Sequence, residues 1–373
     1  MAIAVALLLT GSLVYCVLVL RAVLQYLAVR PVPLHIYEPI SILKPLHGLD
    51  EGLEENLRAC FEQDYNMFEI LFAARDAVDP ALALVEKLRA EYPKVEIKVI
   101  VTGEPPYPNA KVYSLDKMLA EARNNLLVMS DSDVRVTPGM LRRIAAEFQD
   151  LKLGVATCPY RAVSGDSLWS ELEAIGMNTE FLAGLMAARM IEGVKFAVGP
   201  TIAARRSALE AIGGFDTLSE FLAEDFVMGN LAAEKGFGVI LSSYTIEHRI
   251  GSQHFGANMR HRLRWARSTR RSRPAGYVGQ LFTNPLPLAL ILVAIAPAWW
   301  PMLVVTILMR IVAAWSTTVW VLKCRLNARF WVLLAVQDVA SFLFWLAGFF
   351  GNTILWRGTK FYLRKDGRFE RIS

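Results

Sequence analysis

The sequence predicts an α/β fold in which a mostly parallel, Rossmann-like sheet is tied to a membrane by an N-terminal anchor and C-terminal transmembrane helices. Two observations carry this prediction. Strand-like apolar runs alternate with single helical patterns through residues 37–252, and long apolar segments flank that region on both sides. In addition, hydrophobic residues make up 54% of the 373-residue chain, and the mean hydropathy of +0.35 is high for a soluble protein.

Residues 1–30 are expected to form an uncleaved membrane anchor. Residues 2–20 are apolar and uncharged, and the apolar pattern continues past Arg21 to Val29. That length can cross a hydrocarbon core of about 30 Å. A cleaved signal peptide is the alternative, but it would need a basic start, and no Lys or Arg precedes Arg21. Arg21 and Arg30 then place the following residues on the cytoplasmic side.

The middle region, residues 37–252, is expected to contain right-handed βαβ units. Strand-like runs lie at 40–43, 68–74, 95–101 and 126–129, and helical patterns lie between them at 51–63, 80–91 and 115–122. Strands separated by single helices form a mostly parallel sheet, and its ligands bind beyond the carboxyl ends of the strands. The sequence contains neither GxGxxG nor GxxxxGK[ST], so neither a dinucleotide fingerprint nor a P-loop is supported.

Three aspartates are expected at that edge of the sheet. Asp76 follows the second strand, and Asp131 and Asp133 follow the fourth. In an extended chain, residues i and i+2 point the same way, so Asp131 and Asp133 can face one ion with Ser132 turned away. Such oxygen ligands suit Mg²⁺ or Mn²⁺, and Mg²⁺ completes its shell with substrate phosphates. The pair is therefore a candidate diphosphate clamp, although the motif alone is more typical of a solvated turn.

A second acidic pair, Glu224 and Asp225, lies inside an apolar helical pattern. Burial raises the pKa of a carboxyl group, which suits a general base. An exposed helix face that carries two solvated carboxylates is the alternative.

Residues 253–280 are expected to hold a basic helix at the membrane surface. Its core is the stretch MRHRLRWARSTRRSRP, which begins at Met259. On a helix, four of its arginines share one stripe: Arg260, Arg264, Arg267 and Arg271. These side chains can bind anionic lipid headgroups, and one or two can contact a leaving diphosphate. Nucleic-acid binding is disfavoured, because the chain is membrane-anchored and acidic at its sheet edge.

Residues 281–356 are expected to contain C-terminal transmembrane helices, followed by a basic tail at 357–373. Residues 281–322 hold one charge, Arg310, and a turn at 297–301 suggests two spans. Residues 330–355 suggest another span, in which Gln337 and Asp338 should contact protein rather than lipid. Four complete spans that begin outside would leave the basic tail outside, against the positive-inside rule. A re-entrant or flat C-terminal segment would remove this conflict.

The four cysteines form no CxxC pair and the five histidines form no HxxxH or HExxH pattern. Neither a zinc site nor a redox motif is therefore indicated, and we expect all four cysteines to be reduced.

Taken together, these stretches resemble the membrane-bound inverting glycosyltransferases with a GT-A-type domain, most closely the ceramide glucosyltransferases of glycosyltransferase family 21. Each motif is weak alone, but the combination covers nearly the whole chain. The matching stretches are SILKPLHG, ILFAARDAVDPAL, NAKV, SDSDVRV, the GP-to-GGF segment that begins at Gly199, AEDFVMG, RLRW and the WRG segment that begins at Trp356.

The resemblance implies roles for individual residues. It places Asp76 and Lys111 at the nucleotide, Asp131 at the metal and diphosphate, and Asp225 as the catalytic base, and it matches Arg264 and Trp265 to the last pair of a (Q/R)xxRW motif. The sequence departs from the family at two positions. His261 stands where the motif has Gln or Arg, and Asp133 completes a DxD that is shortened in the animal enzymes.

The resemblance implies transfer of a hexose from a UDP-sugar, expected to be UDP-glucose, to the hydroxyl of a membrane lipid, expected to be ceramide. The reaction would use Mg²⁺ or Mn²⁺ in a multi-pass membrane protein whose catalytic domain faces the cytoplasm. Bacterial hopanoid-linked glycosyltransferases share the histidine at the motif position, so transfer of N-acetylglucosamine or a hexose to a hopanoid lipid is an alternative. A processive polysaccharide synthase and a non-catalytic scaffold that binds nucleotide sugar or anionic lipid are further alternatives.

Overall fold

A seven-stranded sheet forms the centre of the protein, which a computed structural model describes at residues 1–30, 32–356 and 358–372. The strand order is β3-β2-β1-β4-β8-β6-β9. Only β8 runs antiparallel to its neighbours β4 and β6, and the other pairs are parallel, so the predicted mostly parallel sheet is confirmed. The strands are β1 (Ile40–Pro45), β2 (Phe68–Ala74), β3 (Glu96–Val101), β4 (Leu126–Ser130), β6 (Leu153–Thr157), β8 (Thr201–Arg205) and β9 (Gly238–Leu241).

The helices of the first half follow the predicted βαβ order. They are α2 (Leu53–Phe61), α3 (Pro80–Glu91), α4 (Ala110–Glu121) and α5 (Met140–Glu147). Helix α4 begins five residues before the predicted start, because the Asn109 side chain accepts a hydrogen bond from Val112 N at 3.2 Å and caps the helix. This cap places Lys111 in the first turn of α4.

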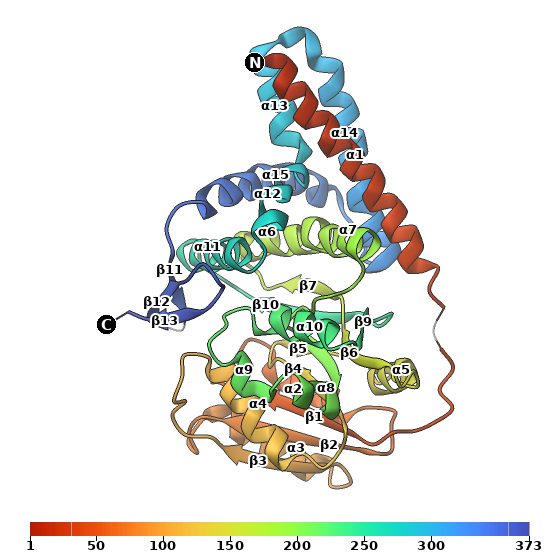
Figure 1. Ribbon diagram of the computed structural model, residues 1–373, viewed down its shortest axis with the longest axis vertical. Coiled ribbons are helices and arrows are strands. Elements are labelled where there is room, and N and C mark those ends of the chain that lie inside the picture. The colour runs from red at the N-terminus through yellow and green to blue at the C-terminus, as the bar shows by residue number, and fades with distance from the viewer. Residues whose placement is uncertain (31, 357, 373) are drawn as a thin grey trace.

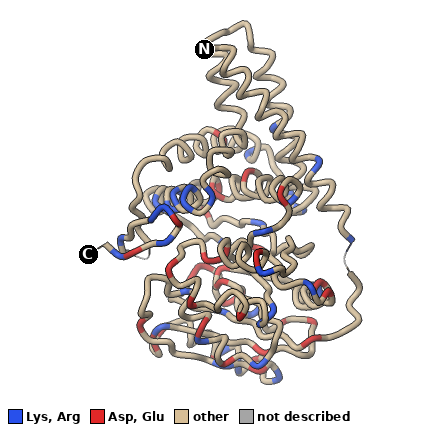
Figure 2. Tube along the Cα trace, in the orientation of Figure 1, with Lys and Arg blue, Asp and Glu red and all other residues tan. Residues whose placement is uncertain are grey.

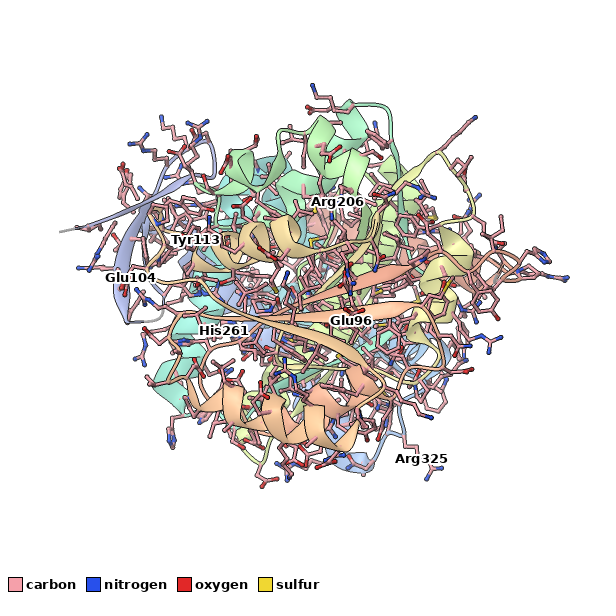
Figure 3. The ribbon with its side chains drawn as sticks, turned by 90° about the horizontal axis from the view of Figure 1, so that it is seen from below. Glu96, Glu104, Tyr113, Arg206, His261 and Arg325 are labelled. Carbon is pink, nitrogen blue, oxygen red and sulfur yellow. The ribbon has the colours of Figure 1, made fainter. Side chains whose placement is uncertain are left out.

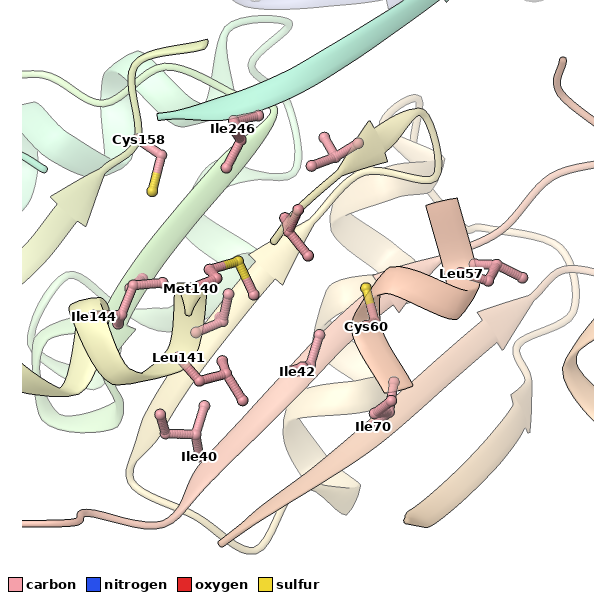
Figure 4. Packing of buried hydrophobic residues seen from close by; sticks show 14 of the residues in the cluster. Ile40, Ile42, Leu57, Cys60, Ile70, Met140, Leu141, Ile144, Cys158 and Ile246 are labelled. Carbon is pink, nitrogen blue, oxygen red and sulfur yellow. The ribbon is translucent and has the colours of Figure 1, made fainter. Parts of the chain in front are cut away.

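Apolar side chains cover both faces of the sheet. Ile40, Ile42 and Ile70 are fully buried with Leu57 of α2 on one face (Figure 4), and Leu43 is buried in a separate cluster on the other. A strand covered on both faces reads as a continuous apolar run, which is why the sequence pattern located β1, β2 and β4.

The second half adds helices above the sheet and a small second sheet. Helices α6 (Leu168–Gly176), α7 (Leu182–Glu192) and α11 (Phe255–Ser272) lie between the central sheet and the membrane-side helices (Figure 1). A π-helical turn at Met177–Phe181 joins α6 to α7. The other elements are β5 (Val134–Arg135), β7 (Tyr160–Ser164), β10 (Ile246–Gly251), α8 (Arg206–Ala211), α9 (Gly214–Leu218), α10 (Glu224–Glu234) and α12 (Pro274–Gly279).

The membrane-side helices are α1 (Ala2–Leu27), α13 (Pro285–Ile295), α14 (Trp300–Trp315, continued by a π-helical segment to Val321) and α15 (Ala328–Gly348). Helices α1, α13 and α14 pack together into a column that projects from the body, and α15 crosses its foot (Figure 1). The projecting part carries no charged side chain among the described residues (Figure 2). Within the described chain, residues 2–27, 297–321 and 328–348 form helices long and apolar enough to cross a membrane. A pair bent by 55°, Pro274–Phe282 with Pro285–Ile295, could be a fourth.

The C-terminal region differs from its prediction in detail. Helix α13 has 11 residues and extends only about 16 Å, so a second span beside residues 297–321 requires α13 together with the preceding segment Pro274–Phe282, and the two spans expected at 281–322 stay a prediction. The span expected at 330–355 ends at Gly348, and the chain continues into a three-stranded antiparallel sheet of β11 (Thr353–Trp356), β12 (Thr359–Leu363) and β13 (Phe369–Arg371). The basic tail is therefore largely folded, although Arg357, at its predicted start, lies outside the described residues.

Candidate active site

A cavity of about 1380 Å³ runs from the carboxyl end of β4 to the membrane-side helices. It brings together six of the predicted site residues: Lys111, Asp131, Asp133, Asp225, Arg264 and Trp265. Asp76 is not in this group. It is exposed in the turn after β2, whereas its neighbour Arg75 lines the cavity and forms an ion pair with Glu104, which lies at the rim of the molecule (Figure 3). The nucleotide role of Asp76 stays a prediction.

Asp131 and Asp133 lie in a tight turn rather than in the extended chain that the sequence argument assumed. Val134 N donates to the carbonyl of Asp131 at 3.2 Å, which closes the turn. The fully buried Lys44 of β1 donates from Nζ to the same carbonyl at 2.7 Å. Sequence reasoning missed Lys44, although a lysine inside the apolar run of β1 was an available signal.

Lys111 links the two acidic motifs. Its Nζ lies 2.7 Å from Asp131 Oδ1 and 3.4 Å from Glu224 Oε1. Burial alone would lower the pKa of Lys111, but the charges of Asp131 and Glu224 outweigh it and raise the pKa. Burial is also the main reason that the pKa of Asp131 is raised, and Lys111 opposes that shift. The lysine therefore stays cationic beside the candidate diphosphate clamp.

Asp133 is paired with His248, which sequence reasoning also missed. The His248 Nε2 atom lies 3.2 Å from Asp133 Oδ2. Burial would raise the pKa of Asp133, but His248 outweighs it and lowers the pKa. His248 belongs to β10, which pairs with β5 directly after the turn, so a contact across 115 residues depends on the second sheet and left no local signal.

The two aspartates fit a divalent cation that takes its remaining ligands from a substrate. Asp133 Oδ1 and His248 Nδ1 are buried, and neither has a hydrogen-bond partner within the described residues. Those residues contain no preformed group of three or more His, Cys, Asp or Glu side chains that could hold a metal ion. Two carboxylates with phosphate oxygens are nevertheless a common set of ligands for Mg²⁺.

Asp225 lies in the first turn of α10 and faces the same cavity. Burial raises its pKa to about 7, the charge of Glu224 adds to the shift, and Lys111 opposes it. A Cβ atom on Gly199 would lie 2.9 Å from Asp225 Oδ2, so the absence of a side chain at this position lets the carboxylate approach Gly199 and Lys111. The Asp225 side chain is half-buried, whereas its neighbour Glu224 is only 9% exposed, so the expected raised pKa is found but the expected full burial is not, and the role of Asp225 as a base stays a prediction.

Helix α11 presents Arg264 and Trp265 to the cavity. His261 is one of the two departures from the family pattern. Its Nδ1 atom lies within hydrogen-bond distance of Glu173 Oε1, at 2.7 Å. Its ring centroid lies 5.4 Å from the ring centroid of Trp265. Glu173 is only 5% exposed. A buried carboxylate therefore holds His261 against Trp265.

Other arginines of α11 bind the end of α15. Arg267 donates to the carbonyl oxygens of Phe350 at 3.1 Å and Thr353 at 2.6 Å, and Arg270 donates to Gly351 O at 2.8 Å. These carbonyl groups follow the last residue of α15, in the turn that leads to β11 and at the start of β11. This part of the basic cluster (blue in Figure 2) therefore holds the chain where it leaves α15.

Comparisons with known proteins agree with this geometry. A family model described as Glycosyl transferase family 21 matches residues 3–369. Ceramide glucosyltransferase 1 of Caenorhabditis elegans is 28% identical over 207 residues, which is 55% of this chain and 44% of that protein. The ceramide glucosyltransferase of Komagataella phaffii is 31% identical over 140 residues, 36% of this chain and 27% of that protein. The matched segments thus span less than half of these curated relatives.

Among solved structures, a mannosyltransferase from Pyrobaculum calidifontis, in complex with GDP-Man and Mn²⁺, aligns over 93% of this chain and 99% of its own, with a TM-score of 0.54 and 18% identity. This likeness supports the fold. Because the family model covers almost every residue, from the membrane anchor to the last strand, the chain belongs to glycosyl transferase family 21.

Proposed function

We propose that the protein transfers glucose from UDP-glucose to the hydroxyl of a membrane lipid, with ceramide as the acceptor and inversion at the anomeric carbon. One observation carries the proposal. The same cavity is lined by Asp131, Asp133 and Asp225 at the sheet edge and by Tyr15 and Trp345 of membrane-side helices. A donor diphosphate and a lipid head can therefore meet in one cavity. The ceramide glucosyltransferases among the relatives support this choice of donor sugar and acceptor.

Asp225 acts as the general base in this proposal. It takes the proton from the acceptor hydroxyl as that oxygen bonds to the anomeric carbon and the bond from this carbon to the UDP oxygen breaks. A base with a pKa of about 7 is well matched to this task near neutral pH. A single in-line displacement inverts the configuration.

Cationic side chains that line the same cavity stabilise the departing UDP. Lys111 remains protonated, and Arg264 lines the cavity with it, so both can offset negative charge on the diphosphate. Asp131 and Asp133 would hold Mg²⁺ or Mn²⁺, which when bound neutralises phosphate charge. The Mn²⁺ in the complex of the P. calidifontis mannosyltransferase supports a metal of this kind.

The proposed orientation places the catalytic domain in the cytoplasm. Arg21 and Arg30 flank the inner end of α1. We propose that α1, the bent segment that ends in α13, and α14 cross the bilayer, while α15 lies in its plane at the foot of the column. Three crossings put the basic C-terminal sheet on the cytoplasmic side, which removes the conflict with the positive-inside rule.

The test is transfer by purified protein in detergent–lipid micelles that contain ceramide, with UDP-glucose, with and without Mn²⁺. We expect metal-dependent glucosylceramide by mass spectrometry. Asp225→Asn should reduce the rate on the order of 10² to 10⁴-fold because the amide cannot accept the proton. It should still bind UDP-glucose, and its thermal stability should not fall, because a neutral side chain removes a buried charge.

A different result would change the proposal in a defined way. Near-full activity of Asp225→Asn would remove Asp225 as the base. A glycosylated hopanoid polyol instead of glucosylceramide, in a parallel reaction, would keep the mechanism and change the acceptor, and a polymeric product would indicate a polysaccharide synthase. UDP-glucose binding without transfer to any acceptor would favour the non-catalytic scaffold.

A further inference from the structure

The membrane end of the cavity is unexpectedly polar. Five of the polar side chains that line it are Tyr15 of α1, Glu180 of the π-helical turn, Arg262 of α11, and Gln337 and Ser341 of α15. We call this set the polar ring. It lies where α1 and α15 meet the rest of the protein, a region in which apolar packing would be the default. Polar groups at membrane depth usually serve a ligand or a pathway.

The side-chain amide of Gln337 is held in a fixed position, and one of its two polar atoms has no hydrogen-bond partner among the described residues. Its side chain is 2% exposed and lines the cavity. Gln337 Nε2 donates to Ser341 Oγ at 2.7 Å, whereas Oε1 is buried without a hydrogen-bond partner among the described residues. A Cβ atom on Gly176 would lie 2.4 Å from Nε2, so the glycine of α6 leaves space for this amide. A buried unpaired acceptor is rare in folded proteins and points to a donor that is supplied from outside.

The same pattern recurs at Tyr15. Its hydroxyl is buried and has no partner within the part of the chain that the structure describes. It faces α7 at Gly184, where an added Cβ atom would lie 4.0 Å from the oxygen. A tyrosine hydroxyl can both donate and accept, so Tyr15 and Gln337 offer a ligand complementary hydrogen bonds.

Charged members complete the polar ring. Glu180 Oε1 accepts from Thr283 Oγ1 at 3.1 Å and from Asn284 Nδ2 at 2.9 Å, which fixes the carboxylate at the cavity wall. The Arg262 guanidinium lies 4.1 Å from the ring centroid of Phe344 and donates to Ser341 Oγ at 3.2 Å. The ring is therefore braced by α11, α15 and the turn before α13.

We propose that the polar ring binds the head of the acceptor lipid beyond the reacting hydroxyl and so determines acceptor specificity. The acceptor must then carry a further hydrogen-bonding group, an amide or a second hydroxyl, next to the hydroxyl that receives the sugar. A long-chain alcohol with a single hydroxyl leaves Gln337 Oε1 and Tyr15 Oη unpaired in the complex, and a site built to bond a polar group rejects an analogue that lacks it. This inference rests on the proposed function, because it assigns the acceptor part of the same site.

The experiment compares two acceptors in mixed micelles, ceramide and a saturated long-chain monoalcohol, and measures kcat/KM for each at saturating UDP-glucose. The wild-type protein should prefer ceramide by about 10- to 100-fold. Gln337→Leu, which has a similar shape but no amide, should reduce that preference at least about fivefold by raising KM for ceramide. Transfer to the monoalcohol should not fall, because the variant lacks the acceptor oxygen that this alcohol leaves unpaired. Tyr15→Phe removes one hydroxyl and should act in the same direction.

Thr306→Val is the matched control. Thr306 is a fully buried polar residue of α14 whose hydroxyl donates to Met302 O of its own helix at 2.7 Å, and it is not among the described residues that line the cavity. It should leave the preference intact. Equal use of both acceptors by the wild-type protein, or an equal effect of Gln337→Leu and Tyr15→Phe on both acceptors, would overturn the specificity proposal while leaving the transferase function in place. Lack of transfer to either lipid would overturn both.

Discussion

At the scale of single residues, the environment of Asp225 makes the proposed reaction depend on pH. The base must be deprotonated to accept a proton, and burial together with Glu224 raises its pKa to about 7. We expect kcat/KM to rise as the pH rises through about 7. Glu224→Gln removes a charge that raises this pKa, so it should shift the rising limb to lower pH.

The pH profile of Glu224→Gln needs a control on the same helix. Glu234 is exposed at the far end of α10, and Glu234→Gln should leave the limb in place. A limb that stays at the same pH in Glu224→Gln would show that a group other than Asp225 controls the profile.

Gly199 supports a second prediction at this scale. In Gly199→Ala, the new methyl group would lie 2.9 Å from Asp225 Oδ2 and must displace it. Because a shift of about 1 Å in a catalytic group can reduce the rate on the order of 10²-fold, we expect a loss of that size in kcat.

The matched variant for this test is Gly139→Ala, where an added Cβ atom meets no described atom within 4 Å. It should retain wild-type kcat in the same transfer assay. A normal rate in Gly199→Ala would mean that the carboxylate tolerates displacement and is not held for catalysis.

Sequence patterns located the site residues whose signal is local. Asp131 and Asp133 follow an apolar strand, and Asp225 is acidic within an apolar helix, so each could be selected from its neighbours in the chain. His248 could not be assigned in this way, because its role depends on a contact with Asp133 across 115 residues. Lys44 has a local signal, a lysine in an apolar run, but its partner Asp131 lies 87 residues away. Asp76 was selected from a local signal, yet it does not line the cavity among the described residues. A position directly after a strand does not determine where the following turn directs a side chain.

At the scale of elements, an ion pair joins α14 to α15. Arg310 and Asp338 are 5% and 1% exposed, and two hydrogen bonds of 2.7 and 2.8 Å connect them. Asp338→Asn should destabilise the protein by about 3–5 kcal/mol because it leaves the arginine charge buried and unpaired. Thermal unfolding in detergent would measure the loss.

The double variant Arg310→Met with Asp338→Leu separates charge from packing. It removes both charges and should recover most of the stability lost in Asp338→Asn. If the double variant is as unstable as the single one, packing at these positions rather than the unpaired charge is responsible.

How well the bounds of an element could be predicted depends on the strength of its local sequence signal. The predicted bounds match β2 and α3 fully, because buried strands and a helix with an Asp-Pro start have strong local signals. The C-terminal elements were misjudged because an apolar run does not show where a helix ends. Gly351, with φ of +76°, and the arginines of α11 end α15 and redirect the chain, and neither feature changes the hydropathy of residues 330–355.

At the scale of the whole molecule, the arrangement of the column and α15 predicts the topology. Single-cysteine variants at two exposed positions, Ala298→Cys between α13 and α14 and Lys365→Cys in the C-terminal sheet region, can be made after the four native cysteines are replaced. An impermeant maleimide should label the first from outside and the second from the cytoplasmic side. Labelling of both from outside would mean that α15 crosses the bilayer.

The cavity that joins the sheet edge to the membrane-side helices has a consequence for kinetics. In the proposed reaction the lipid tails never leave the bilayer, so the acceptor reaches the protein by diffusion in two dimensions while the sugar nucleotide arrives in three. The rate should then follow the mole fraction of acceptor in the surface and fall when inert lipid dilutes it at constant bulk concentration. The transfer rate of an enzyme with such a cavity therefore depends on the lipid composition of its membrane.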